Sequence, residues 1–306
     1  MRLFIFILIV ILHGSCTKEV EITIPNNGTQ FVVNGYIENG KPATILLTRS
    51  LSYFAPQNYD NIFSSFIEGA TIQIISETGE TEILNYVGPQ YHDTWMYNYI
   101  GNSIIGEEGQ TYRIRINKGD TLLTSIASIP NIAELNKDSL RFLYRPFDST
   151  YCYLYGFYQD PDTIGNSNRI FTRTNQDPLF APNLDQNGNY NDEYINGDGL
   201  GFPMYKGRGF WQDWDYGEDW EEIDGVCGPT IGFWCIGDSV ELKMSSVNRA
   251  YWDFWNSIQY NNPGGPFGNP SDVISNINGG LGVWGGVSSE KINLIADPSI
   301  ENPIVN

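Results

Sequence analysis

The sequence predicts an all-β fold made of two β-sandwich domains. Short runs recur in which β-branched or aromatic residues alternate with polar ones, and this period of two is typical of strands. Turns such as ENGK, ETGE and NKGD separate several of the runs, and their glycines tolerate the positive φ of tight hairpins. With 32 glycines in 306 residues, strands and turns are favoured over long helices. A chain of this length can form one large core or two ordinary ones, and we expect two.

Residues 1–15 are expected to be a lipoprotein signal peptide. The apolar run over 3–12 is too short to be a stable transmembrane anchor, so it indicates export. Gly14 and Ser15 then precede Cys16, and this small-small-Cys ending resembles the lipobox of bacterial lipoproteins. We expect Cys16 to become the first mature residue and to carry the acyl chains that hold the protein to a membrane. The alternative is an ordinary signal peptide followed by an incidental cysteine.

The N-terminal domain is predicted to span residues 30–129, after a polar, turn-rich tether at 16–29. We expect an immunoglobulin-like or transthyretin-like sandwich of about seven strands. Alternation predicts strands at 31–37, 43–48, 70–76, 81–86, 111–117 and 121–128.

The C-terminal domain is predicted to span residues 130–306 and to be a larger β-sandwich with one short helix. A proline and a charged, non-alternating stretch at 128–138 mark the boundary. Strands are predicted at 138–145, 151–158, 168–174, 238–245 and 290–296.

One segment of this domain, SSVNRAYWDFWNSIQY, has the helical period instead. The residues that fall on one helical face are Val247, Tyr251, Phe254, Trp255 and Ile258. Ser246 is the expected N-cap. An apolar stripe of this kind favours core packing over a cofactor site.

Net charge limits the partners of the mature chain. Removal of residues 1–15 leaves 16 Lys and Arg against 36 Asp and Glu, a formal net charge of −20. A surface this acidic repels nucleic acid and anionic lipid headgroups. We therefore expect no nucleic acid partner, and contact with the membrane only through the lipid on Cys16.

The export signal implies that the three further cysteines are in an oxidising compartment, where disulfides can form. CGPTIGFWC places a Gly-Pro turn between Cys227 and Cys235, as in a hairpin that a disulfide could close. The alternatives are two buried free thiols, or a bridge from Cys152 to either cysteine. Zinc is not expected, because only His92 remains after processing and no pair of cysteines has close ligand spacing.

Residues 209–225, GFWQDWDYGEDWEEIDG, combine five aromatic rings with seven carboxylates and no cation. The spacing of Trp211, Trp214, Tyr216 and Trp220 lets several rings face the same way, which predicts contact with a ligand or partner. Alternatively, the rings cover the second core while the carboxylates face water. Glycoside hydrolysis by two of the carboxylates is a further alternative, although crowding on one loop favours solvation over the required geometry.

A second candidate site is the segment DQNGNYNDE at 185–193. Calcium takes six to eight oxygen ligands, and a glycine permits the sharp bend between them. The residues that could supply the oxygens are Asp185, Asn187, Asn189, Asp192 and Glu193. The spacing differs from that of a full twelve-residue calcium loop, and Asn-Gly is also a common hairpin turn, so a plain surface loop is the alternative.

Several segments carry a resemblance to a known family. They are FVVNGYI at 31–37, EGATIQI at 68–74, GQTYRIRI at 109–116, SIP at 128–130, IGDSVELKMSSVNRAYWDFW at 236–255 and NPSDVISNINGGLGVWGGVSS at 269–289. With the lipobox and the acidic leader after it, they resemble the domain-of-unknown-function 4249 family of Bacteroidota outer-membrane lipoproteins. The resemblance covers nearly the whole mature chain, but it implies no catalytic residues, so no site is carried over.

The high glycine content around Trp284 in GGLGVWGG indicates a specific local structure. The glycines predict a bulged strand or close backbone packing, because a phosphate-binding loop would need a following helix and a Lys or Ser/Thr at fixed spacing.

The resemblance implies an outer-membrane lipoprotein, often encoded beside a TonB-dependent transporter. We therefore expect a non-enzymatic accessory or ligand-capturing subunit of an outer-membrane β-barrel protein, with a TonB-dependent transporter as the first candidate. The segment CTKEVE, which begins at Cys16, resembles surface-export signals, so we expect the protein to face the cell exterior. The alternatives are a surface glycan-active enzyme that uses the carboxylates of 209–225, and a structural or adhesive subunit of an envelope machine.

Overall fold

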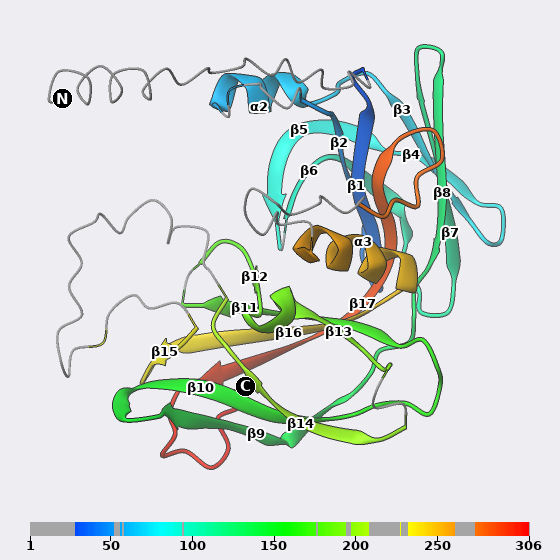
Figure 1. Ribbon diagram of the computed structural model, residues 1–306. Coiled ribbons are helices and arrows are strands. Elements are labelled where there is room, and N and C mark those ends of the chain that lie inside the picture. The colour runs from blue at the N-terminus through cyan, green and yellow to red at the C-terminus, as the bar shows by residue number, and fades with distance from the viewer. Residues whose placement is uncertain are drawn as a thin grey trace, which may run out of the picture.

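The structure is a computed structural model, which describes residues 28–51, 56, 58–93, 95–175, 177–193, 197–207, 227, 232–260 and 273–305. The all-β prediction is confirmed, because strands form most of the described chain (Figure 1). Cys16 and the predicted signal peptide lie outside the described residues. The four predicted contact residues Trp211, Trp214, Tyr216 and Trp220 lie outside them too, as do the carboxylates of 209–225.

The N-terminal half is a sandwich of two sheets. One sheet has the order β4-β3-β7-β8 and consists of β3 (Thr71–Ser76), β4 (Thr81–Ile83), β7 (Thr111–Lys118) and β8 (Thr121–Ser128). The strands of the opposite sheet in this half are β1 (Phe31–Glu38), β2 (Pro42–Arg49), β5 (Asn85–His92) and β6 (Trp95–Ile105). A short helix, α2 (Tyr59–Ser65), begins after Asn58, whose side chain accepts a hydrogen bond from the Asn61 N–H.

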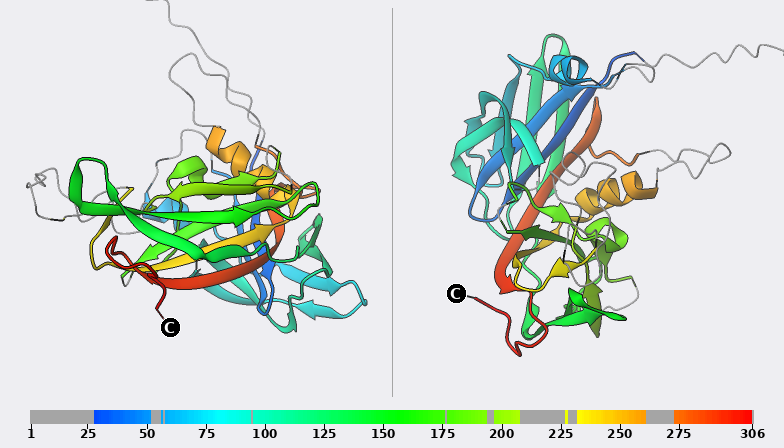
Figure 2. Two further views of the ribbon diagram at one scale, coloured as in Figure 1. Left: turned by 90° about the horizontal axis from the view of Figure 1, so that it is seen from below. Right: turned by 90° about the vertical axis from the view of Figure 1, so that its left-hand side faces the viewer.

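The two halves share one sheet. Within the described residues this sheet has nine strands in the order β12-β11-β16-β17-β1-β2-β6-β5, with β13 also paired to β11. Strand β17 (Leu281–Ile295) pairs in parallel with β1 from Leu281 to Val287, and antiparallel with β16 (Ser239–Val247) from Val287 to Ile295. It therefore runs through both halves, as Figure 1 and the right-hand view of Figure 2 show.

The shared strand also completes the N-terminal core. Trp284 is fully buried there, and its indole Nε1 donates to the Tyr112 carbonyl at 3.1 Å. Ile277, just before the strand, belongs to the same core. The first core therefore draws on residues from both sides of the predicted boundary between residues 129 and 130.

The C-terminal half is the second sandwich. Its part of the shared sheet contains β11 (Ser167–Thr174), β12 (Ala181–Pro182), β13 (Asn189–Asn191), β16 and β17, and it packs on β9 (Leu135–Arg145), β10 (Asp148–Gln159), β14 (Gly199–Met204) and β15 (Trp234–Cys235). Phe142 and Trp234 meet edge to face in this core, with ring centroids 5.7 Å apart. Strand β11 is buried on both faces because the second sheet covers one face and α3 the other.

Helix α3 (Arg249–Tyr260) packs on the outer face of the shared sheet (Figure 1). The predicted apolar stripe is confirmed for Tyr251 and Phe254, which are buried with Val283 and Val287 of β17. It was wrong for Val247, which lies in β16, and for Ile258, which is exposed. The N-cap prediction was wrong: Ser246 lies in β16, and the helix begins after Asn248, whose carbonyl accepts from Tyr251 and Trp252. Neither α2 nor α3 has the length and apolarity needed to cross a membrane.

The predicted close packing around Trp284 is confirmed. A Cβ on Gly285 would lie 2.1 Å from Cδ2 of Tyr251. Gly282 has φ of +105°, and a Cβ there would lie 1.8 Å from the Val33 carbonyl oxygen. These glycines let β17 approach both α3 and β1.

Candidate functional site

The second sandwich contains a cavity of about 210 Å³ between its two sheets, which we name the ligand pocket. The residues that line it are Tyr158, Asn168, Ile170, Gln186, Tyr190, Asn191, Leu200, Phe202 and Met244. They come from β10 and β14 on one side, and from β11, β13, β16 and the 3-10 helix η1 (Asp185–Gly188) on the other.

Strand alternation places these side chains. Asn168 and Ile170 share one face of β11, and Met244 lies opposite Ile170 on β16, so all three form a buried floor. The walls are the rings of Tyr190 and Phe202, whose centroids are 5.5 Å apart. Leu200 and Gln186 are exposed and mark the mouth of the pocket.

The inner end of the pocket is polar. Four hydrogen bonds form a chain there: Ala133 N–H donates to Ser246 Oγ at 2.9 Å, Ser246 to Asn168 Oδ1 at 3.0 Å, Asn168 Nδ2 to Tyr158 Oη at 3.1 Å, and Tyr158 to Asp160 Oδ1 at 3.0 Å. The first donor is a backbone N–H, which can only donate, and Ser246 and Tyr158 each accept one hydrogen bond and donate one.

Burial raises the pKa values of two tyrosine side chains that line the pocket. It raises the pKa of Tyr158, and the hydrogen bond to Asp160 adds to the rise. Burial also raises the pKa of Tyr190, with a contribution from Asp185. Both phenols are therefore neutral hydrogen-bonding groups at pH 7, and neither is a general base.

The sequence pattern of the family described as Domain of unknown function (DUF4249) matches residues 17–293 of this chain. The chain belongs to this family. A comparison with curated proteins finds no match. Solved structures similar to this DUF4249 protein include a pullulanase complexed with maltotriose from Anoxybacillus sp. LM18-11, with 8% identity and a TM-score of 0.21. The match covers 70% of this chain and 24% of that enzyme, and a score this low carries no argument about fold or activity.

The predicted calcium segment of the DUF4249 protein serves partly to build the pocket. Its Gln186, Tyr190 and Asn191 line the cavity. Of the predicted ligands, Asp192 Oδ2 instead accepts the N–H groups of Gly165 and Asn166 at 2.7 and 2.8 Å.

The other described residues of the predicted calcium site lie in different surroundings. Asp185 lies beside the Tyr190 hydroxyl, Asn189 is buried in β13, and Glu193 is exposed. The side chain of Asn187 lies outside the described part of the chain. No group of three His, Cys, Asp or Glu side chains suited to a metal occurs among the described residues. The calcium site stays a prediction.

Cys227 and Cys235 form a disulfide, with Cα atoms 5.7 Å apart, which is the pairing that the Gly-Pro turn led us to expect. Cys152 is a buried free thiol on the neighbouring strand β10, and burial raises its pKa to about 12. Such a thiol is a poor nucleophile because almost none of it is thiolate at neutral pH.

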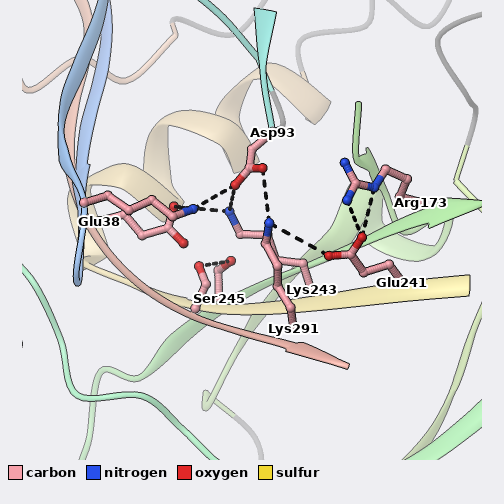
Figure 3. A network of polar contacts seen from close by, with 9 residues as sticks. Glu38, Asp93, Arg173, Glu241, Lys243, Ser245 and Lys291 are labelled. Atoms are coloured by element: carbon pink, nitrogen blue, oxygen red, sulfur yellow. Dashed lines mark hydrogen bonds and ion pairs between the residues drawn. The ribbon is translucent and has the colours of Figure 1, made fainter. Parts of the chain in front are cut away.

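A second polar feature, the charge cluster, lies where the two sandwiches meet (Figure 3). Its members are Glu38, Lys41, Asp93, Lys243 and Lys291, with Glu241 and Arg173 as an extension. The carboxylate of Asp93 contacts three lysines, at 2.9 Å for Lys41, 3.3 Å for Lys243 and 3.2 Å for Lys291.

The charge cluster is structural. Burial alone would raise the pKa of Asp93, but Lys243, Lys41 and Lys291 outweigh it and hold that pKa well below its usual range. The adjoining cavity is about 10 Å³, which is at most the space that one water needs. Every charged group of the cluster already has a partner of opposite sign, which accounts for the cluster as a contact between the two sandwiches.

Sequence reasoning missed most of the pocket. Tyr158, Asn168 and Met244 come from predicted strands, but nothing in the alternation sets them apart as site residues. Strands β11 and β16 contain several other polar residues, so no signal in the sequence singles out Asn168 or Ser246.

Proposed function

We propose that this DUF4249 protein is an outer-membrane lipoprotein that captures a small ligand and serves as an accessory subunit of an outer-membrane β-barrel, most simply a TonB-dependent transporter. The observation that carries the proposal is the ligand pocket. The pocket has a volume of about 210 Å³ and opens to solvent at the exposed residues Leu200 and Gln186, so a small ligand can enter it and cover its apolar lining.

The lining of the pocket supports binding over catalysis. Concave, mainly apolar cavities with a few fixed polar groups are typical of ligand sites. The nine described lining residues include no carboxylate, histidine, cysteine, serine or lysine. A nucleophile with an adjacent base, which common hydrolases require, is therefore not supplied by these residues.

A larger groove of about 780 Å³ is less suited to a specific ligand. It is lined by polar and charged residues, among them Glu134, Lys137 and Glu290. Lys137 already pairs with Glu290, and its side chain is half exposed. Solvent competes with such groups, so the groove offers little selectivity.

The proposed lipid attachment and the proposed barrel partner are supported by the sequence. The lipobox-like ending before Cys16 supports a lipid anchor, and the acidic leader supports a location on the cell exterior. The barrel partner rests on the association that the family resemblance implies.

The test is purification of the tagged protein from its native host by gentle detergent extraction. We expect mass spectrometry to show acyl chains on Cys16, and a barrel protein to copurify. The Cys16→Ser variant should lose both the lipid and the barrel. Protease treatment of whole cells should digest a surface-exposed protein. An unmodified N-terminus on a freely diffusing protein, with no barrel protein bound, would overturn the proposal.

A further inference from the structure

We infer that the ligand pocket takes a neutral, largely apolar group that carries a hydroxyl or carbonyl at its inner end. The inference rests on the ligand-capture function proposed above, and it adds the chemical class of the ligand.

Size and lining favour an apolar group. The cavity of about 210 Å³ corresponds to roughly seven waters at about 30 Å³ each. Its floor includes Ile170 and Met244, and the rings of Tyr190 and Phe202, which contact each other, form part of its wall. Space of this size beside two aromatic rings suits a group about as large as one aromatic ring with a short side chain.

The hydrogen-bond chain leaves two unused sites at the inner end. Asn168 donates one Nδ2 hydrogen to Tyr158, and no described residue accepts the other. The Tyr158 oxygen donates to Asp160 and accepts from Asn168, so one lone pair remains. A ligand hydroxyl can accept from Asn168 and donate to Tyr158. A carbonyl can use the Asn168 donor alone.

The groups that line the pocket disfavour a ligand that carries a charge. An anion would find no lysine or arginine among the lining residues, and the hydrogen-bond chain ends at the buried carboxylate of Asp160. An ammonium could donate to the free lone pair of Tyr158, but it cannot accept from the free N–H of Asn168, so one of the two sites would stay unused beside a second donor. An anion would lose its water without a cationic partner, and an ammonium would exchange its water for one neutral acceptor.

The experiment compares matched probes on the purified mature protein. Phenylethanol, phenylacetate and phenylethylammonium share one ring and a short chain, and differ in the charge at the end. We expect phenylethanol to bind at least about tenfold more tightly than either ion, by calorimetry. We also expect it to shift the side-chain amide NMR signal of Asn168.

The Tyr158→Phe variant separates the polar end from the apolar walls. It should weaken phenylethanol by about fivefold, the effect of one lost hydrogen bond, and leave ethylbenzene unchanged. The matched control is Tyr155→Phe, on the same strand but outside the pocket lining, which should alter neither probe. NMR spectra of both variants at the titration temperature check that each is folded, because Tyr158→Phe also removes the hydrogen bonds with Asn168 and Asp160.

The outcomes separate the two proposals. A charged probe that binds at Asn168 as tightly as phenylethanol would overturn the neutral class but leave ligand capture in place. If none of the probes, ethylbenzene included, shifts a pocket signal at millimolar concentration, ligand capture in this cavity is overturned as well.

Discussion

Asp93 and Lys243 contact each other although they are 150 residues apart in the sequence: Nζ of Lys243 lies 3.3 Å from Oδ2 of Asp93. Asp93 lies at the turn between β5 and β6, where it adopts a positive φ of 48°, whereas Lys243 lies in β16. The same carboxylate binds Lys291 of β17 (Figure 3). One side chain of the first sandwich thus holds two strands of the second.

We expect Asp93→Asn to destabilise the fold by about 3 kcal/mol, the lower end of the range for breaking a buried ion pair. The variant leaves Lys243, whose side chain is only 3% exposed, with Glu38 as its remaining carboxylate. Urea unfolding at pH 7 measures the change. The matched control is Asp120→Asn in the exposed β7–β8 turn, which should stay within about 0.5 kcal/mol of the parent protein. Equal midpoints for the two variants would show that Asp93 does not stabilise the junction.

Stability should fall in acid because of the same carboxylates. The folded-state pKa values of Asp93 and Glu38 lie below the ordinary values of 3.8 and 4.5, although burial alone would raise both. A depressed carboxyl pKa stabilises the fold fully above the unfolded-state pKa, and this contribution is lost as the pH falls through the folded-state value. We therefore expect the difference between the parent protein and Asp93→Asn to be constant above about pH 5 and to shrink steadily below about pH 4. Unfolding midpoints at a series of pH values measure it, and a difference that grows in acid would contradict the assignment.

The strands that bury one face could be predicted from the sequence. In β7, buried Tyr112, Ile114 and Ile116 alternate with exposed Arg113 and Arg115, and the strand lies where the alternation indicates. Such a pattern can be recognised in the sequence of a single strand, because each side chain faces either the core or water. The strand can therefore be predicted without knowing which strands pair with it.

Strand β6 could not be predicted from alternation. Its neighbouring residues Asn98 and Tyr99 are both buried, which breaks the alternation. Asn98 can be buried because its side chain accepts from the Leu47 N–H at 2.8 Å and donates to the Leu47 carbonyl at 2.9 Å. Those partners become visible only in the folded chain, so β6 was not predicted, and neither was α2. The predicted strand at 81–86 is likewise divided between β4 and β5.

Long-range pairing could not be predicted either. The predicted strand at 290–296 covers only the end of β17, because the half beside β1 is rich in glycine and lacks alternation. Its role depends on pairs such as Val32 with Leu281, which no local period reveals. The ligand pocket has the same origin, since Tyr158 and Met244 meet only after the two sheets have packed.

Gly285→Ala tests the close packing of α3 on β17. The added Cβ would meet the Tyr251 ring, which is itself held between Tyr36 and Trp255 at centroid distances of 6.4 and 6.2 Å. Overpacking of this kind should cost about 1–3 kcal/mol in chemical denaturation. Gly101→Ala is the matched control, because its Cβ would meet its nearest neighbour at an ordinary 3.4 Å. If Gly285→Ala is no less stable than Gly101→Ala, the helix does not pack where the structure places it.

The disulfide gives the last prediction. A bridge with a sequence separation of 8 should contribute about 2.5 kcal/mol by its effect on chain entropy. We therefore expect the double variant Cys227→Ser with Cys235→Ser to unfold at a lower urea concentration than the parent protein, and we expect reductant to remove the difference.

The number of free thiols tests the same bridge. A chain that begins at residue 17 should show one alkylatable thiol in denaturant before reduction, that of Cys152, and three afterwards. Three thiols before reduction, in protein purified from an oxidising compartment, would show that the bridge does not form there.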